Sequence, residues 1–349
     1  MTTSQSPDFH LNRPGVLIAA LPAVLGFVPE KSLVLVTVDR GEMGCVMRVD
    51  LSDELMDSLG HIADVAAAAK PDSAIAVVVD EEGAGCQMCS DEYRELATAL
   101  QHTLAARGIE LYAAHVVDRV AAGGRWHCAD GCGSAGTVED PSASPLAMAA
   151  VLDGRRLYAR RAELQAVIEV ADPERSSALA DAIDAYAQTQ AERDDAAARR
   201  DVEEAIAAAR RVASGGKLRH AKLIRLACAL IDPLVRDTLY ALAVGQDAAP
   251  AESLWAMLSR TLPQPWRIEA LVLLAFSAYA RGDGPLAGVS LEAALRCDPT
   301  HKMAGMLDTA LQSGMRPEQI RELATTGYRL AERLGVRLPP RRAFRQRAG

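Results

Sequence analysis

Residues 74–80 read AIAVVVD and residues 110–118 read ELYAAHVVD, with one helix-length segment between them. Both are short and mostly apolar, which is typical of strands buried in a sheet. Residues 91–107 fit a helix, and Gly108 is a natural residue to follow its C-terminus. A strand, a helix and a strand at this spacing predict two parallel strands joined by a right-handed crossover.

Two further strands are expected on the N-terminal side of this unit. Residues 32–39 (SLVLVTVD) form a nearly continuous apolar run, and residues 45–51 (CVMRVDL) follow it after the glycine-containing turn 41–44. Ser52 is a suitable N-cap for a helix that runs to about Ala69. Because strand and helix periodicities alternate, this half of the chain predicts an α/β domain with a mixed, partly parallel sheet.

The rest of the chain is expected to be helical. Residues 123–145 are rich in Gly, Ser, Cys and Asp and predict a long irregular loop. Helical patterns then continue, divided by glycine and proline turn signals. We expect an α/β domain at 1–170, a long helical arm or linker at 171–217, an all-α domain with tetratricopeptide-like helix pairs at 218–336 and a basic tail at 337–349.

One window of the helical half, residues 271–299, fits a tetratricopeptide-like repeat. The small, apolar and terminating positions of such a repeat are filled by Leu271, Leu274, Ala275, Ala278, Gly282, Ala287, Leu291, Ala294 and Pro299. Shifting the frame by about 34 residues in either direction loses most of these matches. The sequence therefore predicts one good repeat with degenerate neighbours.

Several stretches resemble one known family. They are LIAALPAVLGFVPEKSLVLV and MRVDL near the N-terminus, then GRWHCADGC, SPLAMAAVLDGRRLYARR and PWRIEALVLLAFSAYARGDGPLAGVSLEAALRCDPTHKMAGMLDTAL. These stretches extend over nearly the whole chain, which resembles the actinobacterial domain of unknown function 4192 family (DUF4192). The resemblance implies an actinobacterial, cytoplasmic protein without an established activity, and it carries over no catalytic residues.

The composition excludes several classes of protein. Half of the 349 residues (50%) are hydrophobic, which is enough for packed cores and excludes wholesale disorder. The 38 basic and 46 acidic residues give a net charge of −8, opposite in sign to that of most nucleic-acid or anionic-membrane binders. The longest apolar run, Gly15–Val28, contains Pro22 and is too short to cross a bilayer, so no membrane segment is expected. Seven cysteines without a signal peptide indicate a reducing cytoplasm rather than a disulfide framework.

Four cysteines follow the ends of the two parallel strands. Cys86 and Cys89 come after the first strand, and Cys128 and Cys132 come after the second. If both loops leave the sheet at its carboxyl edge, the four thiolates could hold a zinc ion, with His127 as an alternate ligand. Free thiols are the competing interpretation. A redox pair at Cys86 and Cys89 is a third, although a helix that begins near Ser90 would leave both thiols slightly before it.

Two carboxylates end the same strands. Asp80 and Asp118 are candidate catalytic residues, because paired carboxylates at a sheet edge can hold Mg²⁺ or act as acid and base. The alternative interpretation is that each carboxylate accepts hydrogen bonds from the N–H groups of its own loop.

The absence of a complete catalytic motif and the repeat-like helices favour a non-enzymatic interaction or scaffold protein with a protein partner. One alternative is an α/β enzyme or metal-dependent regulator with its site at the carboxyl edge of the sheet. A second is a nucleic-acid accessory protein that uses the arginine-rich tail at 337–349, against the acidic average of the chain.

Overall fold

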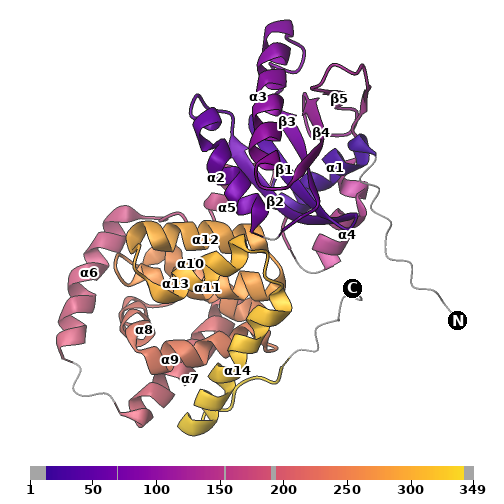
Figure 1. Ribbon diagram of the computed structural model, residues 1–349. Coiled ribbons are helices and arrows are strands. Elements are labelled where there is room, and N and C mark those ends of the chain that lie inside the picture. The colour runs from indigo at the N-terminus through magenta and orange to yellow at the C-terminus, as the bar shows by residue number, and fades with distance from the viewer. Residues whose placement is uncertain (1–12, 69, 153–154, 190–193, 342–349) are drawn as a thin grey trace, which may run out of the picture. The chain divides into compact units, whose positions relative to one another are not determined.

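The computed structural model describes residues 13–68, 70–152, 155–189 and 194–341. The described chain divides into two compact units, with the boundary between Glu163 and Leu164 (Figure 1). The first unit contains the sheet and the second is helical, as the sequence predicts.

The first unit is built on a six-stranded sheet with the strand order β2-β1-β3-β4-β5-β6. The strands are β1 (Ser32–Asp39), β2 (Glu42–Asp50), β3 (Ser73–Val79), β4 (Glu110–Val117), β5 (Arg125–Cys128) and β6 (Ala135–Thr137). Strands β3 and β4 are parallel, and the other neighbouring pairs are antiparallel. The prediction of a mixed, partly parallel sheet is confirmed.

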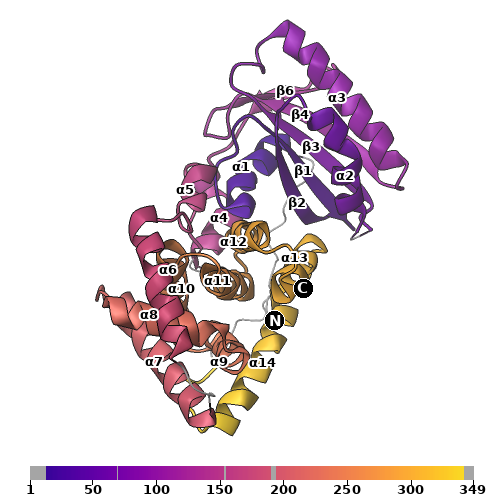
Figure 2. The same cartoon turned by 90° about the vertical axis from the view of Figure 1, so that its left-hand side faces the viewer.

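Helices cover both faces of this sheet (Figure 2). On one face lie α2 (Leu55–Ala67) and α3 (Gln87–Ala105), whose apolar side chains form a core with β1, β3 and β4. On the other face lies the buried α1 (Pro14–Leu25), where a side chain on Gly15 would collide with the carbonyl oxygen of Thr137 in β6. Short elements complete the unit: η1 (Pro141–Ala143), α4 (Pro145–Leu152) and the start of α5 (Arg161–Gln165), which spans the boundary to the second unit.

The segment 123–145 differs from the irregular loop predicted for it. It contains β5, β6 and η1, and β5 pairs with the last three residues of β4, from His115 to Val117. Strands of four and three residues are too short for a period to be recognised. Strand β5 is held by its pairing with β4, and β6 by its pairing with β5, rather than by a local pattern. Helix α3 also begins at Gln87, earlier than the predicted start near residue 91.

The second unit contains α6 (Pro173–Gln188), α7 (Asp195–Ala213), α8 (His220–Ile231), α9 (Pro233–Leu239), η2 (Tyr240–Val244), α10 (Ala248–Thr261), α11 (Arg267–Arg281), α12 (Gly284–Cys297), α13 (Lys302–Gln312) and α14 (Pro317–Leu334). Residues 171–217, expected to form an arm or linker, contain α6 and α7. These two helices pack on α8 and α10 within the unit.

Helix α11 is the centre of this unit, because every residue from Ala270 to Ala280 is buried. Helices α10, α12 and α14 and the turn η2 pack around it. Helix α14 also returns to α9 and η2, where Gly327 comes so close that a Cβ would lie 2.8 Å from the carbonyl oxygen of Thr238. The predicted helix pair at 271–299 corresponds to α11 and α12, but contacts in a linear repeat array stay between neighbours and do not return in this way.

None of the described helices combines the length and the apolar composition that a membrane crossing requires.

Candidate functional sites

His115 and Cys128 meet across the β4–β5 pair. They are register partners, so their side chains lie on the same face of the sheet, and His115 Nδ1 is 3.6 Å from Cys128 Sγ. The imidazole is buried, with 4% of its surface exposed, and contacts the Trp126 ring edge to face at 5.2 Å between centroids. The ring is therefore held in a fixed position beside the thiol.

The turn after β5 brings two more side chains to Cys128. Gly131 and Gly133 adopt positive φ values of 75° and 82°, a conformation that glycine accepts readily, and so allow the chain to fold back. Within the turn, the N–H of Cys132 donates to Asp130 Oδ1 at 2.9 Å. As a result, one ligand atom each from Cys128, Asp130 and Cys132 lie within 4.8 Å of one another.

The surroundings set the protonation of this cluster. Burial, followed by the neighbouring Cys132 thiol, raises the pKa of Cys128 to about 12. Burial lowers the pKa of His115 to about 4, so its imidazole is neutral at pH 7. The N–H and the thiol of Cys132 lower the pKa of Asp130. The cluster therefore offers a neutral imidazole nitrogen, a carboxylate and two thiols.

Cys86 and Cys89 lie at the N-terminus of α3. Cys86 is the N-cap, with extended backbone angles of φ −93° and ψ 126°, and Cys89 is the third residue of the helix. The N–H and thiol of Cys89 and the N–H of Met88 lower the pKa of Cys86. The Cys86 thiol in turn raises the pKa of Cys89. The helix therefore starts about three residues before the predicted Ser90, so Cys86 still precedes its first residue but Cys89 lies inside its first turn.

Asp80 connects the end of β3 to α3. Its Oδ2 accepts a hydrogen bond of 2.6 Å from the Tyr93 hydroxyl, and its Oδ1 accepts one of 3.2 Å from the N–H of Glu82. Burial alone would raise the pKa of Asp80, but these hydrogen bonds, one from the N–H of Gly83 and the charge of Lys31 outweigh it and lower the pKa.

Asp118 closes the connection between β4 and β5. Its Oδ1 accepts hydrogen bonds from the N–H groups of Arg119 at 2.6 Å and Arg125 at 2.8 Å. The Arg119 guanidinium lies 3.2 Å from its Oδ2. Each candidate catalytic carboxylate is thus engaged by the loop that follows its own strand.

The two pairs of cysteines are on different faces of the sheet. Val116 and Ala129 belong to the core beneath α2 and α3, so the alternating residues His115 and Cys128 face the side covered by α1. The described metal-ligand cluster accordingly contains Cys128 and Cys132 without Cys86 or Cys89.

His127, the alternate ligand predicted from the sequence, is the register partner of Val116 and faces away from Cys128. His115 lies beside Cys128 instead, and no pattern in the sequence singles it out. The signal that would have found it is the strand β5, whose pairing with β4 sets the register.

A comparison with protein-family models finds one match. The model described as "Domain of unknown function (DUF4192)" matches residues 14–318, which is most of the chain. The chain belongs to the DUF4192 family. No curated protein and no solved structure matches it.

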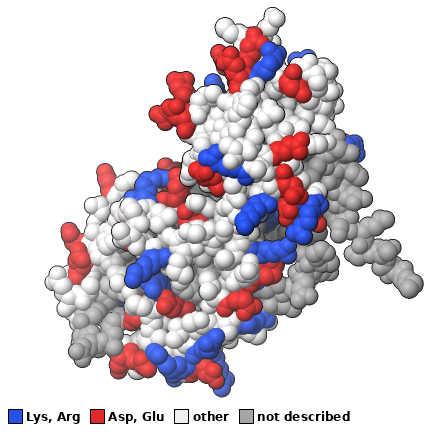
Figure 3. Space-filling view, in the orientation of Figure 1, with Lys and Arg blue, Asp and Glu red and all other residues white. Residues whose placement is uncertain are grey.

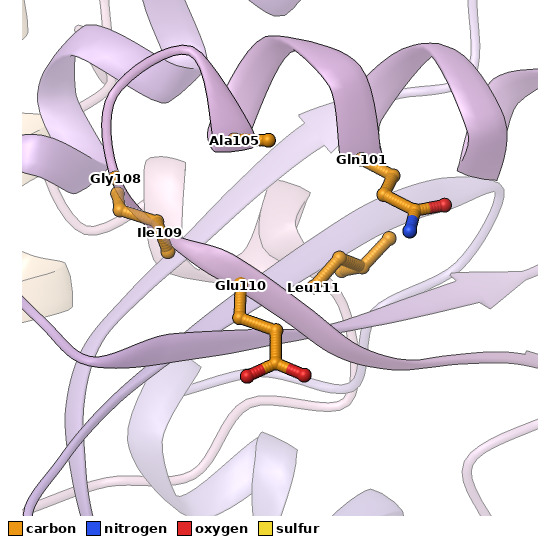
Figure 4. Close-up of a pocket in the computed structure, with 6 residues that line it drawn as sticks. All are labelled: Gln101, Ala105, Gly108, Ile109, Glu110 and Leu111. Atoms are coloured by element: carbon orange, nitrogen blue, oxygen red, sulfur yellow. The ribbon is translucent and has the colours of Figure 1, made fainter.

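This DUF4192 protein also has a shallow pocket between the C-terminal end of α3 and the start of β4. It has a volume of about 350 Å³ and is lined by Gln101, Ala105, Gly108, Ile109, Glu110 and Leu111. Figure 4 shows the Gln101 amide over Leu111, while the Glu110 carboxylate points to the other side of the strand. The pocket holds no converging set of acid, base and nucleophile, so it is a weaker candidate than the cysteine sites.

The described part of the basic tail of the DUF4192 protein is packed against α14. The Tyr328 hydroxyl donates to the Pro339 carbonyl oxygen at 3.0 Å, and the Arg341 guanidinium lies 4.8 Å from the Tyr328 ring centroid. Arg342, Arg345 and Arg347 lie outside the described residues. On the face drawn in Figure 3, basic and acidic side chains are interspersed.

Proposed function

We propose that this DUF4192 protein is a metal-dependent regulator that binds zinc through His115, Cys128, Asp130 and Cys132. The observation that carries the proposal is the convergence of the last three ligands within 4.8 Å, with the His115 ring nitrogen 3.6 Å from Cys128 Sγ.

The donor atoms favour zinc over other cations. Two sulfurs, one imidazole nitrogen and one carboxylate oxygen suit a borderline-soft tetrahedral ion, whereas Ca²⁺ and Mg²⁺ prefer oxygen ligands. Binding would require Cys128 and Cys132 to lose their protons, which a divalent cation promotes. Four protein ligands would close the coordination shell, so the site is structural and not catalytic.

The position of the site between strands determines how a bound metal would affect the stability of the first unit. His115 lies on β4, Cys128 ends β5, and Cys132 lies in the turn before β6. A bound ion would tie these three strands together, and its binding free energy would add to the stability of the first unit. Availability of zinc would thereby control the order of this part of the sheet.

The test is the metal content of protein purified without chelator or metal-affinity resin, followed by titration of the metal-free protein with Co²⁺. We expect about one zinc per chain and thiolate-to-cobalt charge-transfer bands, because a tetrahedral site with sulfur ligands produces them.

The ligand variants C132S and H115N have a matched control in H127N, whose side chain is next to Cys128 in sequence but on the other face. Substitution of a residue that only hydrogen bonds to a metal ligand typically lowers the metal affinity by roughly 10- to 100-fold. We expect C132S and H115N, which remove ligands, to lower the zinc affinity by more than this, and H127N to leave the zinc affinity unchanged. Absence of zinc and of the cobalt bands would contradict the proposal, as would equal losses in H127N and H115N.

Two other functions stay predictions: protein binding by the helical unit and nucleic-acid binding by the tail. Pro339 accepts the hydrogen bond of Tyr328, so a truncation after Leu338 would disturb the fold as well as remove arginines. Substitution of Arg342 and Arg345 by Gln is the cleaner test of nucleic-acid binding, because Arg341 itself packs on the Tyr328 ring. Retention of salt-sensitive binding in that variant would contradict the role of these arginines.

A further inference from the structure

We propose that Cys86 and Cys89 form a redox-active dithiol that exchanges electrons with neutral or cationic disulfides, independently of the proposed zinc site. The proposal rests on the position of both cysteines on one helical turn, on their partial exposure, and on the fixed loop that carries them.

The two cysteines have the spacing and the location that disulfide exchange requires. Cys86 is the N-cap of α3 and Cys89 is residue N3. Side chains at these two positions can reach each other across the first turn of a helix, as they do in a capping box. Each thiol interacts with the other, and both residues are only half buried, so a second sulfur compound can reach them. The turn follows directly on the loop that leaves the carboxyl end of the buried strand β3.

The loop between β3 and α3 is held firmly. Tyr93 of α3 donates its hydroxyl to Asp80 at 2.6 Å, and a Cβ on Gly83 would collide with that hydroxyl and lie 2.7 Å from Asp80 Oδ2. The loop therefore packs directly on the Asp80–Tyr93 pair, and the backbone that carries Cys86 is fixed relative to the helix.

The electrostatics assign different roles to the two sulfurs. The helix N–H groups stabilise the thiolate of Cys86, which makes Cys86 the attacking nucleophile. The pKa of Cys89 is raised, first by the Cys86 thiol and further by Glu92 and Asp80, so Cys89 keeps its proton until the second step. Cys89 is then the resolving thiol.

The reaction balances as an ordinary thiol–disulfide exchange. The Cys86 thiolate attacks one sulfur of a disulfide R–S–S–R′, forms a mixed disulfide and releases R′–S⁻, which takes up a proton. Cys89 loses its proton to solvent, attacks the Cys86 sulfur and releases R–S⁻, which is also protonated. The dithiol is oxidised by two electrons to a Cys86–Cys89 disulfide, the substrate is reduced to two thiols, and a dithiol reductant reverses the change.

The charges near the thiols indicate the class of substrate. Glu81 and Glu82 in the loop before α3, and Asp91 and Glu92 early in the helix, are exposed acidic residues on either side of the two cysteines. An anionic disulfide such as oxidised glutathione is therefore repelled. Met88, with 72% of its surface exposed, lies between the two cysteines and offers an apolar contact. A neutral or cationic disulfide, including one on a protein surface, fits these surroundings.

The experiment treats the reduced full-length protein with cystamine, a cationic disulfide, or with oxidised glutathione at low ionic strength, and maps the products by mass spectrometry. Trypsin separates the two cysteine pairs, because Arg94 and Arg125 lie between them. We expect a Cys86–Cys89 disulfide that forms roughly tenfold faster with cystamine than with oxidised glutathione. Equal rates would overturn the substrate class, and failure of the two cysteines to link to each other would overturn the dithiol.

Two variants test the roles of the sulfurs. C89S should accumulate a mixed disulfide on Cys86, whereas C86S should react slowly, and C45S on β2 is the control that should behave as the unchanged protein. Accumulation of the mixed disulfide on Cys89 in C86S, as fast as on Cys86 in C89S, would overturn the assignment.

The variant H115N separates this proposal from the proposed zinc site. Loss of zinc with retention of the Cys86–Cys89 disulfide supports the independence of the dithiol from the zinc site, and loss of both contradicts it.

Discussion

Cys86 and Cys45 show how position alone changes a thiol. The N–H groups at the start of α3 lower the pKa of Cys86, whereas burial in β2 raises the pKa of Cys45. The thiolate is the reactive form of cysteine, so these two residues should differ in reactivity at the same pH.

We expect the rate of alkylation of Cys86 by iodoacetamide to rise with pH through a midpoint below about 8.5, the value of a free cysteine. The midpoint of Cys45 should lie above that value, because the neutral thiol is favoured by burial. Quantitative mass spectrometry of the two peptides across a pH series measures both. A midpoint of Cys86 at or above that of Cys45 would contradict the described electrostatics.

Tyr93 provides a second prediction at the scale of one residue. Its hydroxyl hydrogen bonds to the Asp80 carboxylate, and only 8% of its surface is exposed. Y93F should therefore lower the free energy of unfolding by about 1.5–3 kcal/mol, as expected for a lost hydrogen bond to a charged group. Urea denaturation measures the change, and Y112F is the control, because Tyr112 is 62% exposed and should tolerate the change. Equal effects of both variants would contradict the stabilising role of the Asp80–Tyr93 pair.

The residues of the candidate sites were partly predictable from the sequence. Cys128 and Cys132 stand out by their spacing, and Asp80 and Asp118 by their places after two strands. His115 was not predictable, because a histidine in a strand becomes a neighbour of Cys128 only through the register of β4 with β5. Register is a property of the assembled sheet and leaves no mark in the local pattern.

At the scale of elements, long segments with a clear period were predicted and short ones were not. Strands β1, β3 and β4 coincide with the predicted strands to within about a residue at each end. The apolar runs of β1 and β3 reflect burial on both faces, and in β4 only the last three residues are buried in this way. Strands β5 and β6 were missed, since runs of four and three residues are too short to show a measurable alternation. The start of α3 was misplaced because cysteine is an unusual N-cap residue.

Helix α14 gives a prediction about packing between elements. In G327A the added methyl group would lie 2.8 Å from the Thr238 carbonyl oxygen and 2.9 Å from the Ala241 Cβ, so α14 must move away from α9 and η2. We expect a loss of about 1–3 kcal/mol in the free energy of unfolding, the usual effect of overpacking.

The matched control is G305A on α13, where a Cβ meets no atom within 4 Å. This substitution should stabilise the protein by about 0.5–1 kcal/mol, because alanine favours the helix over glycine. Thermal and urea unfolding of both variants measure the difference. A neutral G327A would contradict the close approach of α14 to η2.

At the scale of the whole molecule, the sequence predicted an α/β half followed by a helical half, and the structure confirms this fold class. The packing within the helical half was harder to predict from the sequence. The repeat-like pattern at 271–299 falls on α11 and α12, and the burial of α11 on all sides accounts for the small and apolar residues of the pattern's first half. The return of α14 to α9, far away in sequence, could be seen only in the folded chain.

The partial pairing of β4 has a consequence for self-association. Strand β5 pairs with β4 from His115 to Val117, so among the described strands none pairs with residues 110–113 on that side. Such an open edge can add a strand from another molecule, and a charged residue is a common defence against it. Glu110 is exposed at this edge, and E110V should therefore promote concentration-dependent aggregation, measurable by light scattering, while E95V on the exposed side of α3 should not. A monomeric E110V protein would show that the edge is protected by something other than charge.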